Sequence, residues 1–126
     1  MQSITVLVIG DGAETTLICA ALAKQPEVRV VEVAHARRAL SLLRTQSAPM
    51  ALAIASSAVL LGLAGPLLKT LEARGIPLVG IAAGLSQEAK QRALAAGVKE
   101  IHDRPKEWPA YAELLGDIMR RFTQAN

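Results

Sequence analysis

Few residues in this chain could do chemistry, and those that could follow short apolar runs. The turn Gly10-Asp11-Gly12 comes directly after one run, and Ser56 and Ser57 come directly after another. Asp11 could help to hold Mg²⁺, an ion that proteins bind through one or two carboxylates together with a phosphate. A serine hydroxyl becomes a nucleophile only beside a base, and no base stands within a few residues of either serine. This inventory predicts neither an enzyme nor a metal site.

The composition narrows the classes of function further. The 126 residues are 52% hydrophobic and 20% charged, which supplies enough apolar material for the core of one domain. Aromatic residues make up only 2%, too few for a surface that stacks nucleic-acid bases. The net charge of +3 is mild and the basic residues are scattered, so nucleic-acid binding is not expected. The single Cys19 excludes an internal disulfide, and neither His35 nor His102 stands at zinc-ligand spacing.

One long stretch without charge, residues 45–68, would pass a hydropathy test for a membrane span. It contains Pro49, Gly62 and Pro66, which break a continuous helix into shorter elements. We therefore expect this stretch to be buried inside the protein, with no membrane association. The chain also begins without the basic region and cleavage site of a signal peptide, which predicts a cytoplasmic protein.

The residues that could do chemistry are separated by alternating strand-like and helix-like segments. Continuous apolar runs are typical of strands covered on both faces, and apolar residues at helical spacing predict helices between them. The runs cover residues 4–9, 28–33, 50–55, 78–82 and 99–102, and the amphipathic segments cover residues 13–24, 36–45, 66–74, 86–96 and 109–122. Five βα units in series predict an α/β fold with a parallel sheet and helices on both faces. In such sheets, function resides at the carboxyl ends of the strands.

Several of these segments resemble the receiver domain of bacterial response regulators, the CheY-like family, over nearly the whole chain. Residues 6–11 resemble the family's first strand with its acidic pair, and residues 49–55 resemble the third strand, which ends in the phosphoacceptor aspartate. Residues 76–83 resemble the fourth strand, and Arg104-Pro105 resembles the family's Lys-Pro pair. The resemblance implies the flavodoxin-like, doubly wound (βα)5 fold with strand order 2-1-3-4-5, in which residues 1–126 form a single domain.

The chain departs from the family at the positions of the phosphorylation site. Ala55 stands at the phosphoacceptor position, Ala82 at the hydroxyl position and Arg104 at the lysine position. Gly10 replaces the first acid of the pair, so that only Asp11 remains. Phosphoryl transfer to aspartate requires a nucleophilic carboxylate and a bound divalent metal, and a methyl group supplies neither. The chain therefore resembles the aspartate-less pseudo-receivers, and we predict no phosphorylation and no cofactor.

Two further expectations concern the Arg104-Pro105 pair. In the receiver family the corresponding peptide bond is cis, so the resemblance implies a cis Pro105. We also expect the Arg104 guanidinium to form an ion pair with Asp11, in the space where metal and phosphate would otherwise lie.

Without phosphorylation, we expect the domain to act through its surface as a signalling module. In receivers the last two βα units carry contacts to a second copy, a protein partner or an attached output domain. Charges of both signs on this face suit a self-complementary homodimer, and Trp108 or Tyr111 could anchor a partner. Residues 120–126 are typical of a helix that leads to a linker, which predicts that the chain is the N-terminal part of a longer regulatory protein. The predicted contact residues are Lys90, Arg92, Ile101, Trp108, Tyr111, Glu113, Asp117, Arg120 and Arg121.

Two alternatives stay open. The first is a small-ligand or nucleotide-binding domain that uses the Gly10-Asp11-Gly12 turn, because this turn follows a strand and Glu32 comes 20 residues after it. Thr15 stands where the dinucleotide fingerprint has its third glycine, so the cradle is incomplete. The second is a phosphorylatable receiver, which requires that the alignment of the third strand be wrong.

Overall fold

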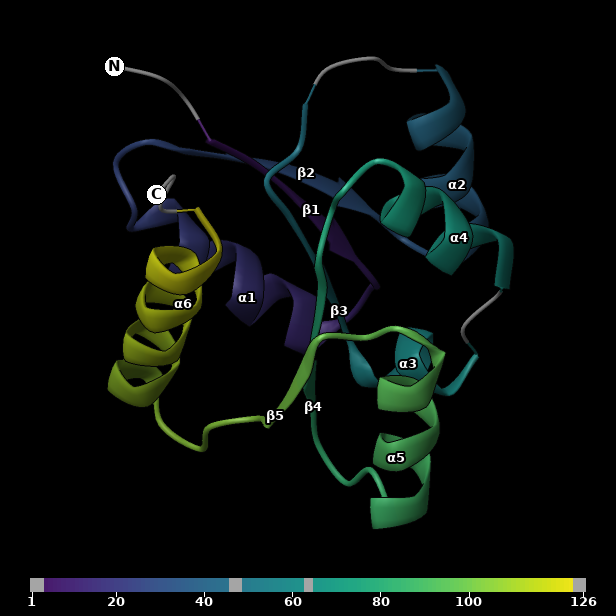
Figure 1. Cartoon of the computed structure of the whole chain (residues 1–126). Coiled ribbons are helices and arrows are strands. Elements are labelled where there is room, and N and C mark those ends of the chain that lie inside the picture. Colours follow the sequence, from purple (N-terminus) through teal and green to yellow (C-terminus); the bar gives the residue numbers. More distant parts are fainter. Residues whose placement is uncertain (1–3, 46–48, 63–64, 124–126) are drawn as a thin grey trace.

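Five parallel strands form one sheet in the order β2-β1-β3-β4-β5 (Figure 1). This computed structural model describes residues 4–45, 49–62 and 65–123; the predicted helix end and linker at residues 124–126 lie outside them. The predicted flavodoxin-like order is confirmed. The strands are β1 Ile4–Ile9, β2 Val28–Val33, β3 Leu52–Ala55, β4 Leu78–Ala82 and β5 Glu100–Asp103. The helices are α1 Ala13–Ala23, α2 Ala36–Thr45, α3 Ser57–Leu61, α4 Gly65–Ala73, α5 Gln87–Ala96 and α6 Trp108–Thr123.

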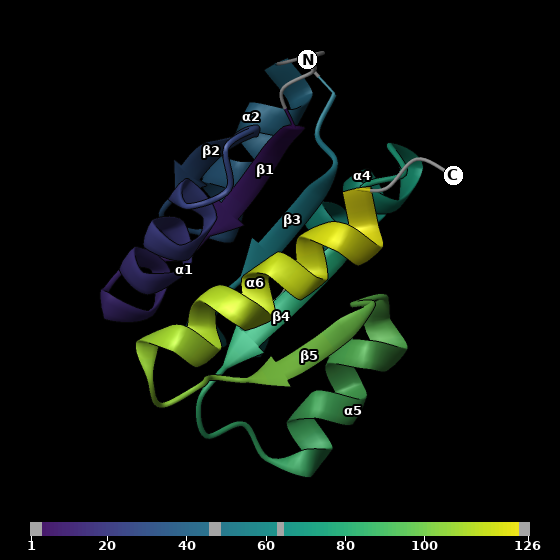
Figure 2. The same cartoon turned by 90° about the vertical axis from the view of Figure 1, so that its left-hand side faces the viewer.

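Helices cover both faces of the sheet, as predicted. Figure 2 shows α1 and α6 on the near face, and α2, α3, α4 and α5 lie against the other face. Alternate residues of β1 point to opposite faces, with Val6 and Val8 packed towards α1 and α6 and Leu7 and Ile9 packed towards α2 and α4. All four are fully buried, which explains why the first apolar run is continuous rather than alternating.

Local capping signals set where two of the helices begin. The Ser86 hydroxyl accepts from the Ala89 N–H at 3.1 Å and caps α5 at its first turn, as its position before the amphipathic segment predicts. At α2, His35 Nδ1 accepts from the Arg38 N–H at 3.2 Å. His35 therefore caps the first turn of α2 through its side chain.

The uncharged stretch around residues 45–68 contains one element that sequence patterns did not predict. After β3 the chain forms the short helix α3, Ser57–Leu61, before α4 begins at Gly65. The reason is packing, because Val59 and Leu60 become buried against the sheet. Among the described residues, no helix is both long enough and apolar enough to cross a membrane.

Candidate functional site

The carboxyl ends of β3 and β4 present methyl groups where a phosphorylation site would present oxygen. Ala55 ends β3 and pairs with Ile9 of β1 and Gly80 of β4, and Ala82 ends β4. Ala55 is 0% exposed and Ala82 is 1% exposed, so both methyl groups belong to the core beneath the site. These two methyl groups supply no nucleophile and no metal ligand.

Beside these methyl groups, the Glu14 carboxylate is linked, directly or through Ser57, to polar groups that follow three strands, β3, β4 and β5. Glu14 Oε1 accepts from the Ser57 backbone N–H at 2.8 Å, and the Ser57 hydroxyl lies 3.0 Å from each carboxylate oxygen. The Ser57 Oγ in turn accepts from the Ala83 N–H at 3.0 Å. Arg104 Nη1 lies 4.0 Å from Glu14 Oε2. One carboxylate from α1 thus connects the ends of β3, β4 and β5.

The structure contradicts two of the predictions made for the Arg104-Pro105 pair. Arg104 pairs with Glu14 and not with Asp11, because the first turn of α1 carries Glu14 inwards whereas Asp11 is exposed in the preceding turn. The expected Asp11–Arg104 ion pair is therefore wrong. The peptide bond before Pro105 is trans, so the cis proline implied by the resemblance is also wrong. The trans isomer is the more stable one for an X–Pro bond in the absence of other constraints, by about 0.5–1 kcal/mol.

Gly10 shows why the first acid of the pair is missing. Its φ is +143°, and a Cβ built on it would lie 2.3 Å from Ser56 Oγ and 2.8 Å from Thr15 Oγ1. A side chain at position 10 would therefore collide with two buried residues and force a backbone conformation that favours glycine. The Thr15 hydroxyl is buried and has no hydrogen-bond partner in the described structure.

The residues present do not fit Mg²⁺, the ion that the receiver fold implies. Asp11 is an exposed carboxylate, and position 10 leaves no room for a second one. The remaining carboxylate, on Glu14, already accepts from Ser57 and lies beside the Arg104 guanidinium. A divalent cation would have to displace a guanidinium and two hydrogen bonds in order to use it. Elsewhere in the described residues, no three His, Cys, Asp or Glu side chains gather in a metal-binding group.

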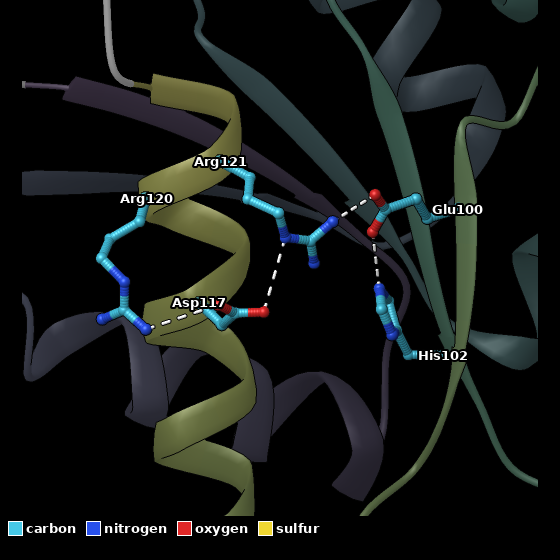
Figure 3. Close-up of polar contacts among 5 residues, drawn as sticks. All are labelled: Glu100, His102, Asp117, Arg120 and Arg121. Atoms are coloured by element: carbon cyan, nitrogen blue, oxygen red, sulfur yellow. Dashed lines mark hydrogen bonds and ion pairs between the residues drawn. The ribbon is translucent and has the colours of Figure 1, made fainter.

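A second polar cluster lies on the predicted interaction face, between β5 and α6 (Figure 3). Arg121 contacts Glu100 on β5 and Asp117 one turn earlier on α6, and His102 Nε2 lies 2.7 Å from Glu100 Oε1. Partial burial opposes ionisation of Glu100, but the hydrogen bonds and charges of His102 and Arg121 outweigh it and lower the pKa of this carboxyl. Arg120 adds a contact of 3.4 Å to Asp117.

The rest of the predicted face divides between surface and core. Trp108 is 39% exposed at the start of α6, and Lys90 of α5 pairs with Asp103 at 2.9 Å. Tyr111 is only 2% exposed and packs in the core cluster that contains Leu115, four residues later. The prediction of Tyr111 as a surface anchor is therefore wrong, since helical spacing places it on the inner side of α6. Burial and the Glu14 charge raise the pKa of its phenol.

Comparison with known proteins identifies the class of fold. No protein-family model matches the sequence, and no curated protein is significantly similar to it. Solved structures of response regulators do match. One from Hahella chejuensis has 19% identity, covers 98% of this chain and 98% of its own length, and gives a TM-score of 0.78. A response regulator in red light signaling of R. palustris has 15% identity, covers 98% of this chain and 96% of its own length, and gives a TM-score of 0.79.

A CpaE2 pilus assembly protein from Sinorhizobium meliloti is also similar. It has 18% sequence identity, covers 90% of this chain and 98% of its own length, and gives a TM-score of 0.62. Identities this low establish the fold alone. The chain has the receiver fold of response regulators, and its site differs from a phosphorylation site in the ways described above.

Proposed function

We propose that this chain is a receiver-like, cytoplasmic module of two-component signal transduction that acts through protein–protein contacts and not by phosphoryl transfer. The observation that carries the proposal is Ala55, a buried methyl group at the end of the third strand. An aspartyl phosphate cannot form without the carboxylate nucleophile and its metal. The module is non-enzymatic in this proposal and forms the N-terminal part of a longer regulatory protein with an attached output domain.

The Glu14 network supports the same proposal. Glu14 and Arg104 form an ion pair with each other. Ser57 also donates both its N–H and its hydroxyl to the Glu14 carboxylate. An incoming phosphoryl group would have to compete with a negative charge that the chain itself supplies. A site filled in this way favours one constant conformation over a switch.

Phosphorylation is tested directly by mass. The protein is incubated with acetyl phosphate and Mg²⁺, and its intact mass is measured beside a phosphorylatable receiver treated in parallel. We expect the control to gain one phosphoryl group and this chain to remain unchanged, with the same melting temperature. A phosphoryl group that localises to the 55–57 segment would overturn the proposal.

We propose that the chain contacts its partner, a second copy or another protein, through the face formed by α5, β5 and α6. Exposed groups of both signs, such as Asp117 and Arg120, suit an isologous contact. Light scattering of the Arg120→Glu variant, with Arg37→Glu as the control, tests this assignment, because Arg37 is also exposed but lies on α2. Only Arg120→Glu should shift a dimer towards monomer. A dimer that responds to neither variant lies on another face.

The alternative, a small-ligand site at the Gly10-Asp11-Gly12 turn, is favoured by one observation. A cleft of about 470 Å³ opens beside this turn and is also lined by His35 and Arg37. A ligand that binds the folded state raises the melting temperature in proportion to RT ln(1 + [L]/Kd). Saturable stabilisation by ATP or GTP would favour this alternative over a module that binds protein alone.

A further inference from the structure

The solvent face of α2 carries an excess of positive charge that equals the net charge of the whole chain. The chain has 14 Lys and Arg residues and 11 Asp and Glu residues, and α2 contains three arginines and no acidic residue. The remaining 11 basic and 11 acidic residues therefore cancel. Arg37, Arg38 and Arg44 are all exposed, on a helix that packs against the face of the sheet opposite α6 (Figure 1).

The three arginines of α2 have no acidic partner within the part of the chain that the structure describes. No ion pair there involves Arg37, Arg38 or Arg44. Asp11 lines the same cleft as Arg37 but does not pair with it. Both arginines of α6, by contrast, lie 3.4 Å from the Asp117 carboxylate. The guanidinium groups of α2 are therefore available to carboxylates from outside the chain.

Arg37 and Arg38 also lie where a cation is unfavourable for the helix. They are the second and third residues of α2, and the partial positive charge at a helix N-terminus favours acidic residues in the first turn. The first turns of α1 and α5 do carry acidic residues, Glu14 and Glu88. Packing does not require the two arginines, because both side chains are exposed. Residues that oppose local stability without a gain in packing are expected at functional surfaces.

We propose that the solvent face of α2 is a docking surface for an acidic segment of a partner protein, whose carboxylates pair with Arg37, Arg38 and Arg44. A guanidinium binds a carboxylate through two parallel N–H donors, which arginine offers and lysine does not. Arg37 and Arg44 are seven residues apart and so span about 10 Å along the helix, a distance that about three extended residues cover. This surface is separate from the face formed by α5, β5 and α6, so the inference goes beyond the proposed function and does not depend on it.

The size and composition of this surface favour a protein segment over other acidic macromolecules. Proteins that hold DNA by its backbone make about six to ten phosphate contacts, more than three arginines supply. Basic clusters that recognise anionic lipids contain about four to eight Lys or Arg residues. A helix that lies on a membrane also inserts large apolar side chains. Those exposed in the described residues, Leu61, Leu94 and Trp108, lie on α3, α5 and α6.

Fluorescence anisotropy of a labelled hexaglutamate peptide tests the proposal, with hexaglutamine as the neutral control peptide. The double variant Arg37→Gln/Arg38→Gln is compared with Lys24→Gln/Lys106→Gln, because each loses two exposed positive charges and only the first loses them from α2. The arginine variant should bind hexaglutamate at least about fivefold more weakly, since an exposed ion pair contributes a factor of up to about five. The lysine variant should change the affinity by less than about twofold, because about 0.15 M salt screens charges that lie more than about 8 Å from the peptide.

The melting temperature of the same variants gives a second readout. Arg37→Gln/Arg38→Gln should melt about 2–5 °C above the natural chain, because two unfavourable charges leave the N-terminus of α2. A gain in stability together with a loss of binding also shows that the weaker binding does not come from unfolding. A fall in the melting temperature would mean that the two arginines serve the fold, and it would overturn the proposal.

Three binding results would also overturn it. The first is equal weakening by the two double variants, which would show that binding follows net charge alone. The second is no binding of hexaglutamate by the natural chain up to about 1 mM. The third is tighter binding to a DNA oligonucleotide of equal charge or to vesicles that contain phosphatidylserine, which would assign α2 to another macromolecule. None of these results affects the phosphorylation test or the light-scattering test, in which Arg37→Glu remains a valid control because the chain is measured without an acidic partner.

Discussion

Substitution of Gly10 by alanine should destabilise this protein more than any other glycine-to-alanine change at the site. Two costs add at this position. The φ of +143° is a conformation that costs a residue with a side chain about 1–3 kcal/mol. The new Cβ would also lie 2.3 Å from Ser56 Oγ and 2.9 Å from Ser56 Cβ, and overpacking of this kind costs about 1–3 kcal/mol. Rotation of the Ser56 hydroxyl relieves the first contact but not the second.

The sum is a loss of about 2–6 kcal/mol in the free energy of unfolding, which is a large part of the about 5–15 kcal/mol that a domain has. The variants Gly12→Ala and Gly80→Ala measure the two costs separately. Gly12 has a φ of +92° with no atom within 4 Å of a built Cβ, so Gly12→Ala measures backbone strain alone. The three atoms nearest to a Cβ on Gly80 all belong to the Leu60 side chain, the nearest at 2.6 Å, so Gly80→Ala measures crowding against a flexible group.

Urea unfolding followed by far-ultraviolet circular dichroism gives the free energy of unfolding of each of the three variants. Equal m-values would show that the substitutions change the stability of the native state and not the compactness of the unfolded state. Gly10→Ala should cost more than Gly12→Ala and more than Gly80→Ala. If Gly10→Ala costs no more than Gly12→Ala, the collision with Ser56 is not real and the reason given for the missing acid fails. The same geometry predicts that Gly10→Asp, which restores that acid, is destabilising as well.

Two further predictions follow from shifted pKa values. The pKa of Glu100 is lowered, so its contact with Arg121 contributes stability above the usual pKa of 4.5 that is lost as the pH falls through the lowered value. The difference in urea midpoint between the natural chain and Glu100→Gln should therefore shrink on acidification below about pH 4.5; a constant difference would contradict this account. At Cys19, burial and the neighbouring Glu32 raise the thiol pKa to about 11 from 9.0, so alkylation by iodoacetamide at pH 8 should be about a hundredfold slower than that of a free thiol. Glu32→Gln should accelerate this reaction, and rapid alkylation of the natural chain would show that the thiol is not shielded.

Much of the fold could be predicted from local patterns. The run at residues 4–9 and the segment at residues 36–45 were predicted with the bounds that β1 and α2 have. Ser86 begins α5 as an N-cap because capping involves only neighbours within one turn. Helix α3 was missed because a helix of five residues is too short to show a period, and only its burial against the sheet stabilises it.

The candidate site was harder to predict. Ala55 and Ala82 lie at the predicted strand ends, because strand order determines which ends are neighbours. Tyr111 was misplaced although its spacing to Leu115 carried the signal, since a tyrosine suits both a surface and a core. Glu14 was missed because Ser57, its main partner, lies 43 residues further along the chain.

The sequence alone determined the class of fold and the absence of a carboxylate from residue 55, because both depend on residue type and on patterns a few residues long. Only the tertiary structure decided what occupies the space above Ala55 and why Gly10 has no side chain. Those answers depend on contacts between the ends of separate strands, within about 4 Å, and such distances are set by how the sheet and its helices pack together.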